Sequence, residues 1–281
     1  MTDTAFQAQY RQEFIQQFEV GESVLRKTVT TEAVIKGQQA VFLVAGSGTT
    51  PASAVTRGVN GLIPARSDNN VQNTATLQEW HDLVRKTGFN VFASQGDQRR
   101  IMQETTKKVL NRKIDLDVLG ELANSTQHTN LSSAPVTASL NLVMKAKTIL
   151  LNNYVPADGN INAVISPAFE AYLMQTKEFA NANYVNDKPF ESGQRMFRWA
   201  GVNFVVSPLL TGLGTNNELC FFYHKDAIGH AIAMNDLQTA VGYQQEQDYS
   251  FARASVFMGP KLLQNSGVVQ VYHDGSAYAA V

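Results

Sequence analysis

Charged residues are scarce in this sequence of 281 residues, where Asp, Glu, Lys and Arg together make up 17%. Typical soluble domains carry about a quarter. Asparagine and glutamine, with 21 residues each, replace much of the missing charge. A surface rich in amides repels copies of itself only weakly and offers many directional hydrogen bonds. The composition therefore favours a protein that assembles with other copies of itself, although neutral, amide-rich monomeric enzymes share it.

Cysteine and long apolar runs are nearly absent. The single cysteine, Cys220, excludes an intrachain disulfide framework and indicates a reducing compartment, and its apolar neighbours predict a buried structural thiol. No apolar stretch approaches the roughly 18 to 20 residues that cross a bilayer. The first residues, "MTDTAFQAQYRQEF", lack the pattern of a secretory signal. We therefore expect a soluble cytoplasmic chain with no membrane partner.

Motifs for catalysis and cofactor binding are also missing. The "GSG" after a predicted strand at 39–46 lacks the ending of a phosphate-binding loop and the third glycine of a dinucleotide fingerprint. The five histidines show no zinc-protease spacing, and Cys220 with His224 would supply only two metal ligands. The net charge of -1 argues against a dedicated nucleic-acid-binding protein. The sequence thus predicts no catalytic residue, no metal site and no cofactor.

An apolar stripe near the N-terminus predicts a packing surface. Tyr10, Phe14 and Phe18 recur at every fourth position with polar residues between them, which indicates a short helix. So small a stripe must pack on something to be stable. It contacts either the core of its own chain or a neighbouring copy.

The segment 37–78 is unusual because a strand leads into a long stretch of Gly, Ser, Thr, Asn and Pro. Long irregular segments inside a compact domain are uncommon and are usually functional loops or disordered. Alternation in "AVTRGV" and "GLIPAR" predicts an extended two-stranded excursion with Arg57 and Arg66 near its tip. A polar hairpin is marginal alone, so we expect it to lie on a partner. The two arginines are either intersubunit contacts or solvated charges.

The longest regular pattern lies at 98–124 and predicts one amphipathic helix of about 40 Å that begins after Asp97 as N-cap. We interpret Asp115 and Asp117 on this helix as solvated, because residues two apart point in different directions. The basic residues of the helix form either a solvated face or a DNA-facing surface: Arg99, Arg100, Lys107, Lys108, Arg112 and Lys113. The apolar face comprises Ile101, Met102, Thr105, Val109, Leu110, Ile114, Leu119 and Leu122.

The remaining patterns indicate helices and strands mixed irregularly, as in an α+β fold. Proline 167 after a predicted strand suits the first turn of a helix. Periodicity predicts a helix at 137–153 and strands at 76–95, 162–167, 201–210, 248–259 and 266–275.

Three stretches, taken in order, resemble the major capsid proteins of tailed bacteriophages, which share the phage and herpesvirus shell fold. "GQQAVF" (37–42) is similar to the loop opening of the short-tailed-phage branch, with Gln38 and Gln39 in place of Lys-Ser. "RKIDLDVLGEL" (112–122) is similar to the closing segment of the spine helix. "FFYHKDAIGHAIA" (221–233) is similar to a strand-to-helix element of the family.

This resemblance implies hexamers and pentamers that close into an icosahedral shell around packaged double-stranded DNA, assembled in the host bacterial cytoplasm. It implies a separate scaffolding protein and a portal as partners. No lysine lies between Lys36 and Lys86, so a lysine crosslink of the loop is not expected. The implied parts are an N-terminal arm (1–36), an extended loop (37–78), a peripheral domain (79–127 and 238–265) with a spine helix (97–124), and an axial domain (128–237 and 266–281).

Two other classes of protein are alternatives. A phage tail-tube protein or other self-assembling component would share the amide-rich surface, but tube proteins consist mainly of strands and a helix of about 40 Å argues against one. An enzyme with an unusual site would be a monomer or dimer that turns over a substrate.

Overall fold

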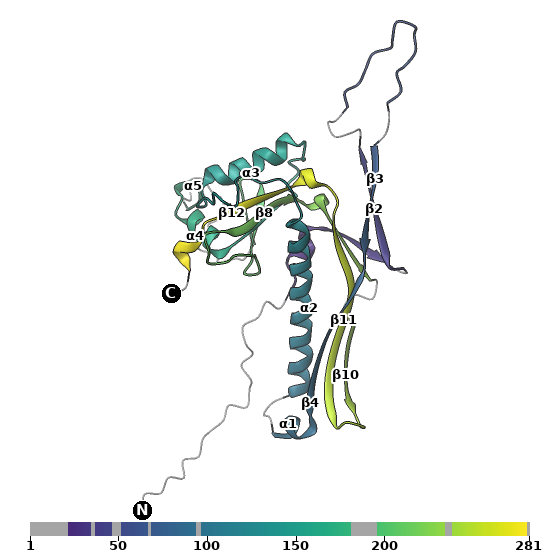
Figure 1. Ribbon diagram of the computed structural model, residues 1–281, viewed down its shortest axis with the longest axis vertical. Helices are drawn as coiled ribbons and strands as arrows, with labels where there is room; N and C mark the ends of the chain where they lie inside the picture. The colour runs from purple at the N-terminus through teal and green to yellow at the C-terminus, as the bar shows by residue number, and fades with distance from the viewer. Residues whose placement is uncertain are drawn as a thin grey trace, which may run out of the picture. The chain divides into compact units, whose positions relative to one another are not determined.

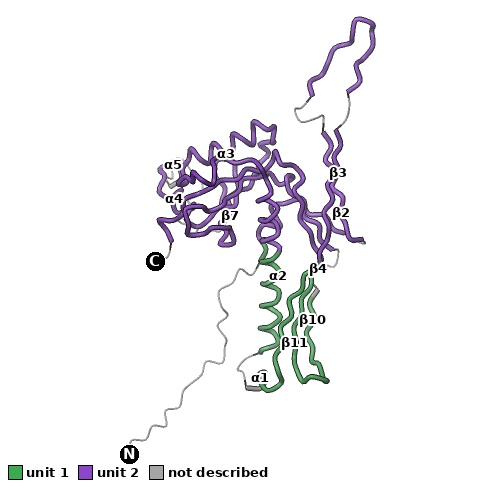
Figure 2. Tube along the Cα trace, in the orientation of Figure 1, with its two compact units in different colours: residues 1–23, 79–113, 235–257 green, residues 24–78, 114–234, 258–281 purple. Residues whose placement is uncertain are grey.

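The computed structural model describes residues 22–34, 37–46, 52–66, 69–93, 97–180, 196–233 and 238–279. The predicted stripe of Tyr10, Phe14 and Phe18 lies outside these residues. The chain divides into two compact units, of which the first comprises 1–23, 79–113 and 235–257 and the second comprises 24–78, 114–234 and 258–281 (Figure 2). Helix α2 (Gln98–Leu122) and strand β11 (Tyr249–Leu262) contribute residues to both units. The mixture of helices and strands confirms the predicted α+β class.

The first unit contains strands β4 (Gln78–Thr87) and β10 (Gln238–Gln244), which both pair with β11. Helix α1 (Gly88–Ala93) follows β4 directly, so the strand predicted through residue 95 is wrong over residues 88–93, while 94 and 95 lie outside the described residues. The strand ends here because the Thr87 hydroxyl accepts a hydrogen bond from Asn90 N at 3.3 Å, as a helix cap does. Gly88 N also donates to the carbonyl of Asp248 at 3.3 Å.

The N-terminal half of α2 begins as predicted, because Asp97 Oδ1 accepts a hydrogen bond from Arg100 N at 3.2 Å. Polar and cation–π contacts join this half to the strands of the first unit. Lys113 Nζ lies 3.7 Å from the centre of the Trp80 ring. Gln103 Nε2 donates to Thr239 Oγ1 at 3.4 Å. Predicted face residues such as Met102 and Leu110 are buried, as the periodicity indicates.

A five-stranded sheet with the order β12-β8-β5-β7-β6 forms the centre of the second unit (Figure 1). Its middle strands read as continuous apolar runs because both faces are covered. Phe169, Phe204 and Phe222 meet in the core, with ring centres 6.0 and 6.5 Å apart for the two pairs that involve Phe222. The strands are β5 (Ile161–Ile165), β6 (Met196–Trp199), β7 (Val202–Val206), β8 (Glu218–His224) and β12 (Val268–His273).

Two helices of the second unit, α3 and α4, begin at serine caps. Ser139 Oγ accepts a hydrogen bond from Leu142 N at 3.3 Å, and Ser166 Oγ accepts one from Phe169 N at 3.1 Å. Pro167 occupies the first turn, as predicted. The helical segments are α3 (Leu140–Asn152), α4 (Pro167–Met174), α5 (Lys177–Ala180), η3 (Asn265–Gly267) and η4 (Ser276–Tyr278).

The segment 221–233 does not end in a helix as the resemblance implied. After β8 comes a 3-10 turn of three residues, η2 (Lys225–Ala227), and then strand β9 (Ile228–Ala233). Strand β9 pairs with β11 antiparallel and with β1 (Thr30–Val34) parallel. A central strand has neighbours on both sides, and residues 228–232 of β9 are buried, which explains why this stretch is mostly apolar without a helical period.

The interpretation of Asp115 as solvated is wrong, because this side chain is 1% exposed. Its carboxylate accepts hydrogen bonds from Val24 N at 3.4 Å and Leu25 N at 3.2 Å. Val24 is the N-cap and Leu25 the first residue of the 3-10 helix η1 (Leu25–Thr28). Spacing along one helix cannot reveal a contact with a segment 90 residues away in the sequence.

The core of the second unit also encloses His273 and Glu218. His273 Nδ1 donates to the carbonyl of Val136 at 3.2 Å, and its Nε2 lies 3.9 Å from Glu218 Oε2. Gly214 N donates to the other carboxylate oxygen at 2.8 Å, and the Ser166 hydroxyl donates to Oε2. Burial lowers the pKa of His273 below its ordinary value, although the Val136 carbonyl and the Glu218 carboxylate oppose this.

The buried His273 predicts a loss of stability in mild acid. Because its pKa is lower in the folded chain, the unfolded chain binds the proton first as the pH falls below about 6.5. The free energy of unfolding should therefore be greatest above that pH and decline as the pH falls toward the folded pKa. Urea unfolding between pH 8 and pH 5 measures this slope. His273→Gln should reduce this slope. The control His81→Gln, at an exposed position, should keep it. An unchanged slope in His273→Gln would show that His273 is not the source of the pH dependence.

Candidate functional site

Strands β2 (Gln39–Gly46) and β3 (Asn69–Thr76) form a two-stranded antiparallel ribbon in the second unit (Figure 1). The strand predicted at 39–46 is confirmed. The register pairs Gln39 with Thr76 and Gly46 with Asn69. The ladder is therefore made by the flanks of the predicted excursion, whereas the hydrogen bonds Gly58 N to Leu62 O and Gly61 N to Gly58 O form a turn between "AVTRGV" and "GLIPAR".

One face of this ribbon is seated on the rest of the unit. Ala40, Phe42 and Ala75 are buried together with Ala231 of β9. The Phe42 ring covers Gly229 so closely that a Cβ at Gly229 would lie 2.9 Å from it. Glycine at 229 leaves room for the ring, and the buried side chains of Ala40 and Phe42 hold the ribbon against the unit.

The other face of the ribbon is apolar and exposed. Val41 and Leu43 alternate with the buried Ala40 and Phe42, and their side chains are 57% and 64% exposed. An ordinary half-buried strand would carry polar residues at these positions. Apolar side chains on both faces of one strand indicate that the second face is covered by something else.

The loop 52–66 carries a larger exposed apolar group. Gly61 N donates to Gly58 O at 2.8 Å and Gly58 N donates to Leu62 O at 3.0 Å, which closes a tight turn. Gly61 has a φ of 70°, a conformation that favours glycine. The tip surface, as we name it, consists of four side chains that are each at least 66% exposed: Val55, Val59, Leu62 and Ile63.

The structure separates the two arginines predicted for the tip. Arg57 adjoins the turn, whereas Arg66 ends the described part of the loop, and both are exposed. Their charge made them stand out in the sequence, whereas the tip surface, which lies around and between them, was not predicted. The available signal was the presence of isolated apolar residues in a segment otherwise rich in Gly, Ser and Asn. Such clusters of exposed apolar side chains usually mark interaction sites.

The six basic residues of the predicted DNA-facing set lie on the first-unit part of α2. Arg99, Arg100 and Lys107 are exposed, while the other three are half-buried. Arg100 Nε lies 4.0 Å from Glu104 Oε1, one helical turn away, and such exposed pairs contribute little to stability. Lys113 covers Trp80 and so has a packing role. Only Asp97 and Glu104 are acidic between residues 97 and 113, which leaves this segment positively charged.

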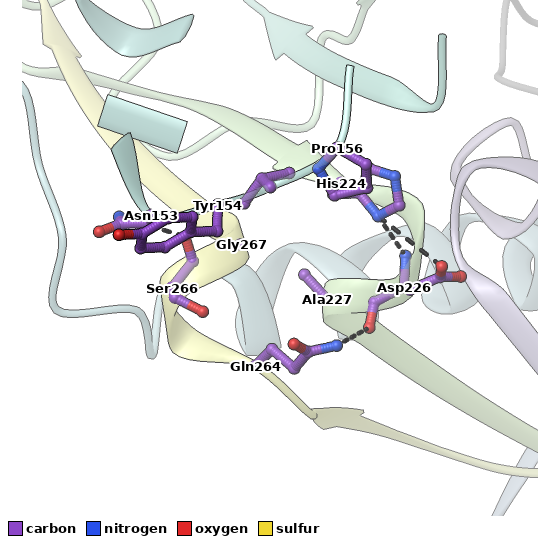
Figure 3. A pocket seen from close by; sticks show the side chains of 10 residues that line it. Asn153, Tyr154, Pro156, His224, Asp226, Ala227, Gln264, Ser266 and Gly267 are labelled. Atoms are coloured by element: carbon purple, nitrogen blue, oxygen red, sulfur yellow. Dashed lines mark hydrogen bonds and ion pairs between the residues drawn. The ribbon is translucent and has the colours of Figure 1, made fainter. Parts of the chain in front are cut away.

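A depression of about 240 Å³ lies beside the end of α3 and the turns η2 and η3 (Figure 3). His224 Nδ1 accepts a hydrogen bond from Asp226 N at 3.2 Å, so its Nε2 carries the proton and donates to Asp158 Oδ1 at 3.2 Å. Hydrogen bonds from Asn160, and then from His224, lower the pKa of Asp158 to about 2. Both ring nitrogens therefore hold the local turn, and neither is presented to the depression as a base.

The described ranges contain neither a cluster of metal ligands nor a helix that could span a membrane. In the part of the chain that the structure describes, no three or more His, Cys, Asp or Glu side chains gather as metal ligands. Among these same residues, no helix is long and apolar enough to span a bilayer. Cys220 is buried in β8, and burial raises the pKa of its thiol to about 12, as expected for a structural thiol.

Comparison with known proteins gives a consistent result. The sequence matches the phage capsid protein family over residues 2–274, whereas no curated protein matches it. The capsid of cyanophage P-SCSP1u has a TM-score of 0.74 at 15% identity, covering 96% of this chain and 93% of that one. A chain from Mycobacterium phage Che8 has a TM-score of 0.74 at 14% identity, covering 96% and 98%.

A third solved structure, the capsid of a native GTA particle, has a TM-score of 0.70 at 14% identity and covers 97% of this chain and 96% of that one. At such low identity these likenesses show the fold alone, and they confirm the capsid fold that the sequence resemblance implied. Since the family match extends over nearly the whole chain, this protein belongs to the phage capsid protein family, whose members are structural proteins of the virion capsid.

Proposed function

We propose that the chain is the major capsid protein of a tailed bacteriophage and forms hexamers and pentamers that close into an icosahedral shell around double-stranded DNA. The observation that carries this proposal is the β2–β3 ribbon with its loop, which exposes Val41, Leu43 and the tip surface in a chain of this family. Interfaces concentrate their binding energy in a few apolar side chains surrounded by polar contacts.

The parts of the subunit follow the layout that the sequence resemblance implied. The arm is 1–36, the extended loop is 37–78, and the peripheral domain is 79–127 and 238–265 with the spine helix 97–124. The axial domain is 128–237 and 266–281. In this layout the loop reaches a neighbouring copy, with Arg57 and Arg66 beside acidic residues there, and Tyr10, Phe14 and Phe18 of the arm form a second intersubunit contact.

The basic part of α2 is the proposed surface for DNA. Arg99, Arg100 and Lys107 are exposed. They would contact the phosphates of the DNA and not the base edges, and therefore bind without sequence preference. Lys108, Arg112 and Lys113 would add to the positive potential over a distance of about one Debye length, roughly 8 Å at physiological salt. The proposal includes a separate scaffolding protein and a portal as partners, assembly in the bacterial cytoplasm, and no catalytic role.

Size exclusion with light scattering and electron microscopy of the purified chain test this function. The chain is expected to form capsomer-sized species or closed shells, either alone or with a scaffolding protein. Many weak contacts of the same kind give strong assembly because their effects multiply over the copies. A chain that stays monomeric under every condition, or that forms long tubes, would contradict the proposal.

A further inference from the structure

The 3-10 helix η1 is capped by a residue far away in the sequence. The first N–H groups of a helix have no partner within it, and a side chain of the preceding residue usually accepts from them. The residue in that position is Val24, whose side chain has no acceptor and makes no such bond. Asp115 replaces it, since its two carboxylate oxygens accept from Val24 N and Leu25 N.

Residues around this cap enter the core of the second unit. Leu25, Thr28 and Val29 are each less than 5% exposed. The Thr28 hydroxyl is hydrogen-bonded to the Tyr223 hydroxyl, and Asn162 Nδ2 donates to the Thr28 carbonyl at 3.3 Å. The attachment is therefore made by two apolar side chains, Leu25 and Val29, in the hydrophobic core and by the buried polar contacts of Thr28.

Strand β1 follows this attachment and is the edge strand of its sheet. Among the described residues, β9 is the strand that pairs with it. Its three central residues, 31–33, are exposed. Edge segments with few buried contacts open locally at a lower free energy than the strands behind them.

From this arrangement we propose that Asp115 is a clasp. Its carboxylate fixes the point at which the N-terminal segment joins the second unit, and loss of that carboxylate releases residues 22–34 while the sheet β12-β8-β5-β7-β6 stays folded. Asp115 is thus a positioning residue for η1 and for strand β1, which follows it. This role deepens the proposed function, because in a shell the clasp would set the place from which the arm reaches a neighbour.

Trypsin cleavage of the unassembled chain tests the clasp directly, because Arg26 and Lys27 follow the capped residues within η1. Proteases cut chain that has opened locally, so the cleavage rate reports the open population. Asp115→Asn keeps the size of the side chain but puts an N–H donor opposite a backbone N–H donor. Cleavage after Arg26 or Lys27 should become at least about tenfold faster, which corresponds to about 1.4 kcal/mol.

Asp117→Asn is the matched control, since it removes a carboxylate two residues away on the same helix and should keep the original cleavage rate. Leu25→Ala removes the apolar anchor and should accelerate the same cleavage by a second route. An original rate in Asp115→Asn would overturn the clasp, and so would digestion throughout the chain, which would make Asp115 a general core residue. Because these rates are measured without assembly, a failure to form shells would count against the proposed function and not against the clasp.

Discussion

Replacing Leu62 and Ile63 with serine is expected to abolish assembly while the chain stays folded. Both side chains are more than 70% exposed, so the substitutions remove almost no buried surface from the isolated chain. Burying one such side chain at an interface stabilises it by about 1.5 to 3 kcal/mol. Two of them contribute about 3 to 6 kcal/mol to each contact, a factor of roughly 10² to 10⁴ in the association constant. Because the same contact recurs many times in a shell, the loss of binding free energy is repeated at each copy and prevents assembly.

Leu131→Ser is the control for this experiment, because Leu131 is also exposed but lies outside the ribbon and loop. Thermal unfolding should change by less than about 0.5 kcal/mol in all of these variants, as is usual for surface sites. On size exclusion, the variant with serine at both Leu62 and Ile63 should be a monomer, whereas Leu131→Ser should assemble like the original chain. Normal assembly would show that the tip surface is no interface, and loss of folding would show that the loop belongs to the core.

Gly259→Ala is expected to be the most damaging small substitution in the ribbon's seat. A Cβ at Gly259 would lie 2.1 Å from the carbonyl oxygen of Thr76 and 2.9 Å from its carbon. Backbone atoms cannot rotate away as a side chain does, so β11 and the end of β3 must separate. Overpacking of this kind costs about 1 to 3 kcal/mol or more. Urea unfolding measures the cost.

Gly120→Ala is the comparison variant, and it is expected to change the stability of the chain in the opposite direction. Nothing lies within 4 Å of a Cβ at this exposed helical position. Alanine should stabilise the chain by about 0.5 to 1 kcal/mol, because glycine is unfavourable inside a helix. Equal stability of the Gly259→Ala variant and the original chain would show that the ribbon is not seated as described.

Local patterns in the sequence predicted many of the elements correctly. The strand at 39–46, the cap at Asp97 and the proline at the start of α4 each follow from a period or a preference that operates within a few residues. Errors arose where a distant segment decides the outcome. Helix α1 forms beside Asp248, and Asp115 is buried because Leu25 needs an acceptor. Neither contact leaves a trace in the neighbouring sequence.

The candidate site was predicted only in outline. Arg57 and Arg66 stand out in the sequence because charge is scarce, and the extended segment that carries them has few apolar residues to fold it. The tip surface escaped notice because isolated apolar residues in a loop have no period to detect. Val41 and Leu43 read as ordinary strand residues until the structure showed that Ala40 and Phe42 occupy the buried face. Only the fold shows which of these apolar side chains are exposed and which are buried.

Cryo-electron microscopy of particles assembled from the chain tests the central claim most directly. The proposed function predicts closed shells in which the chain fills a lattice of hexamers and pentamers. In such a shell, the loop 52–66 of each copy lies against another copy and the tip surface is buried. Open helical tubes, or closed shells in which Val59, Leu62 and Ile63 remain exposed to solvent, would contradict it.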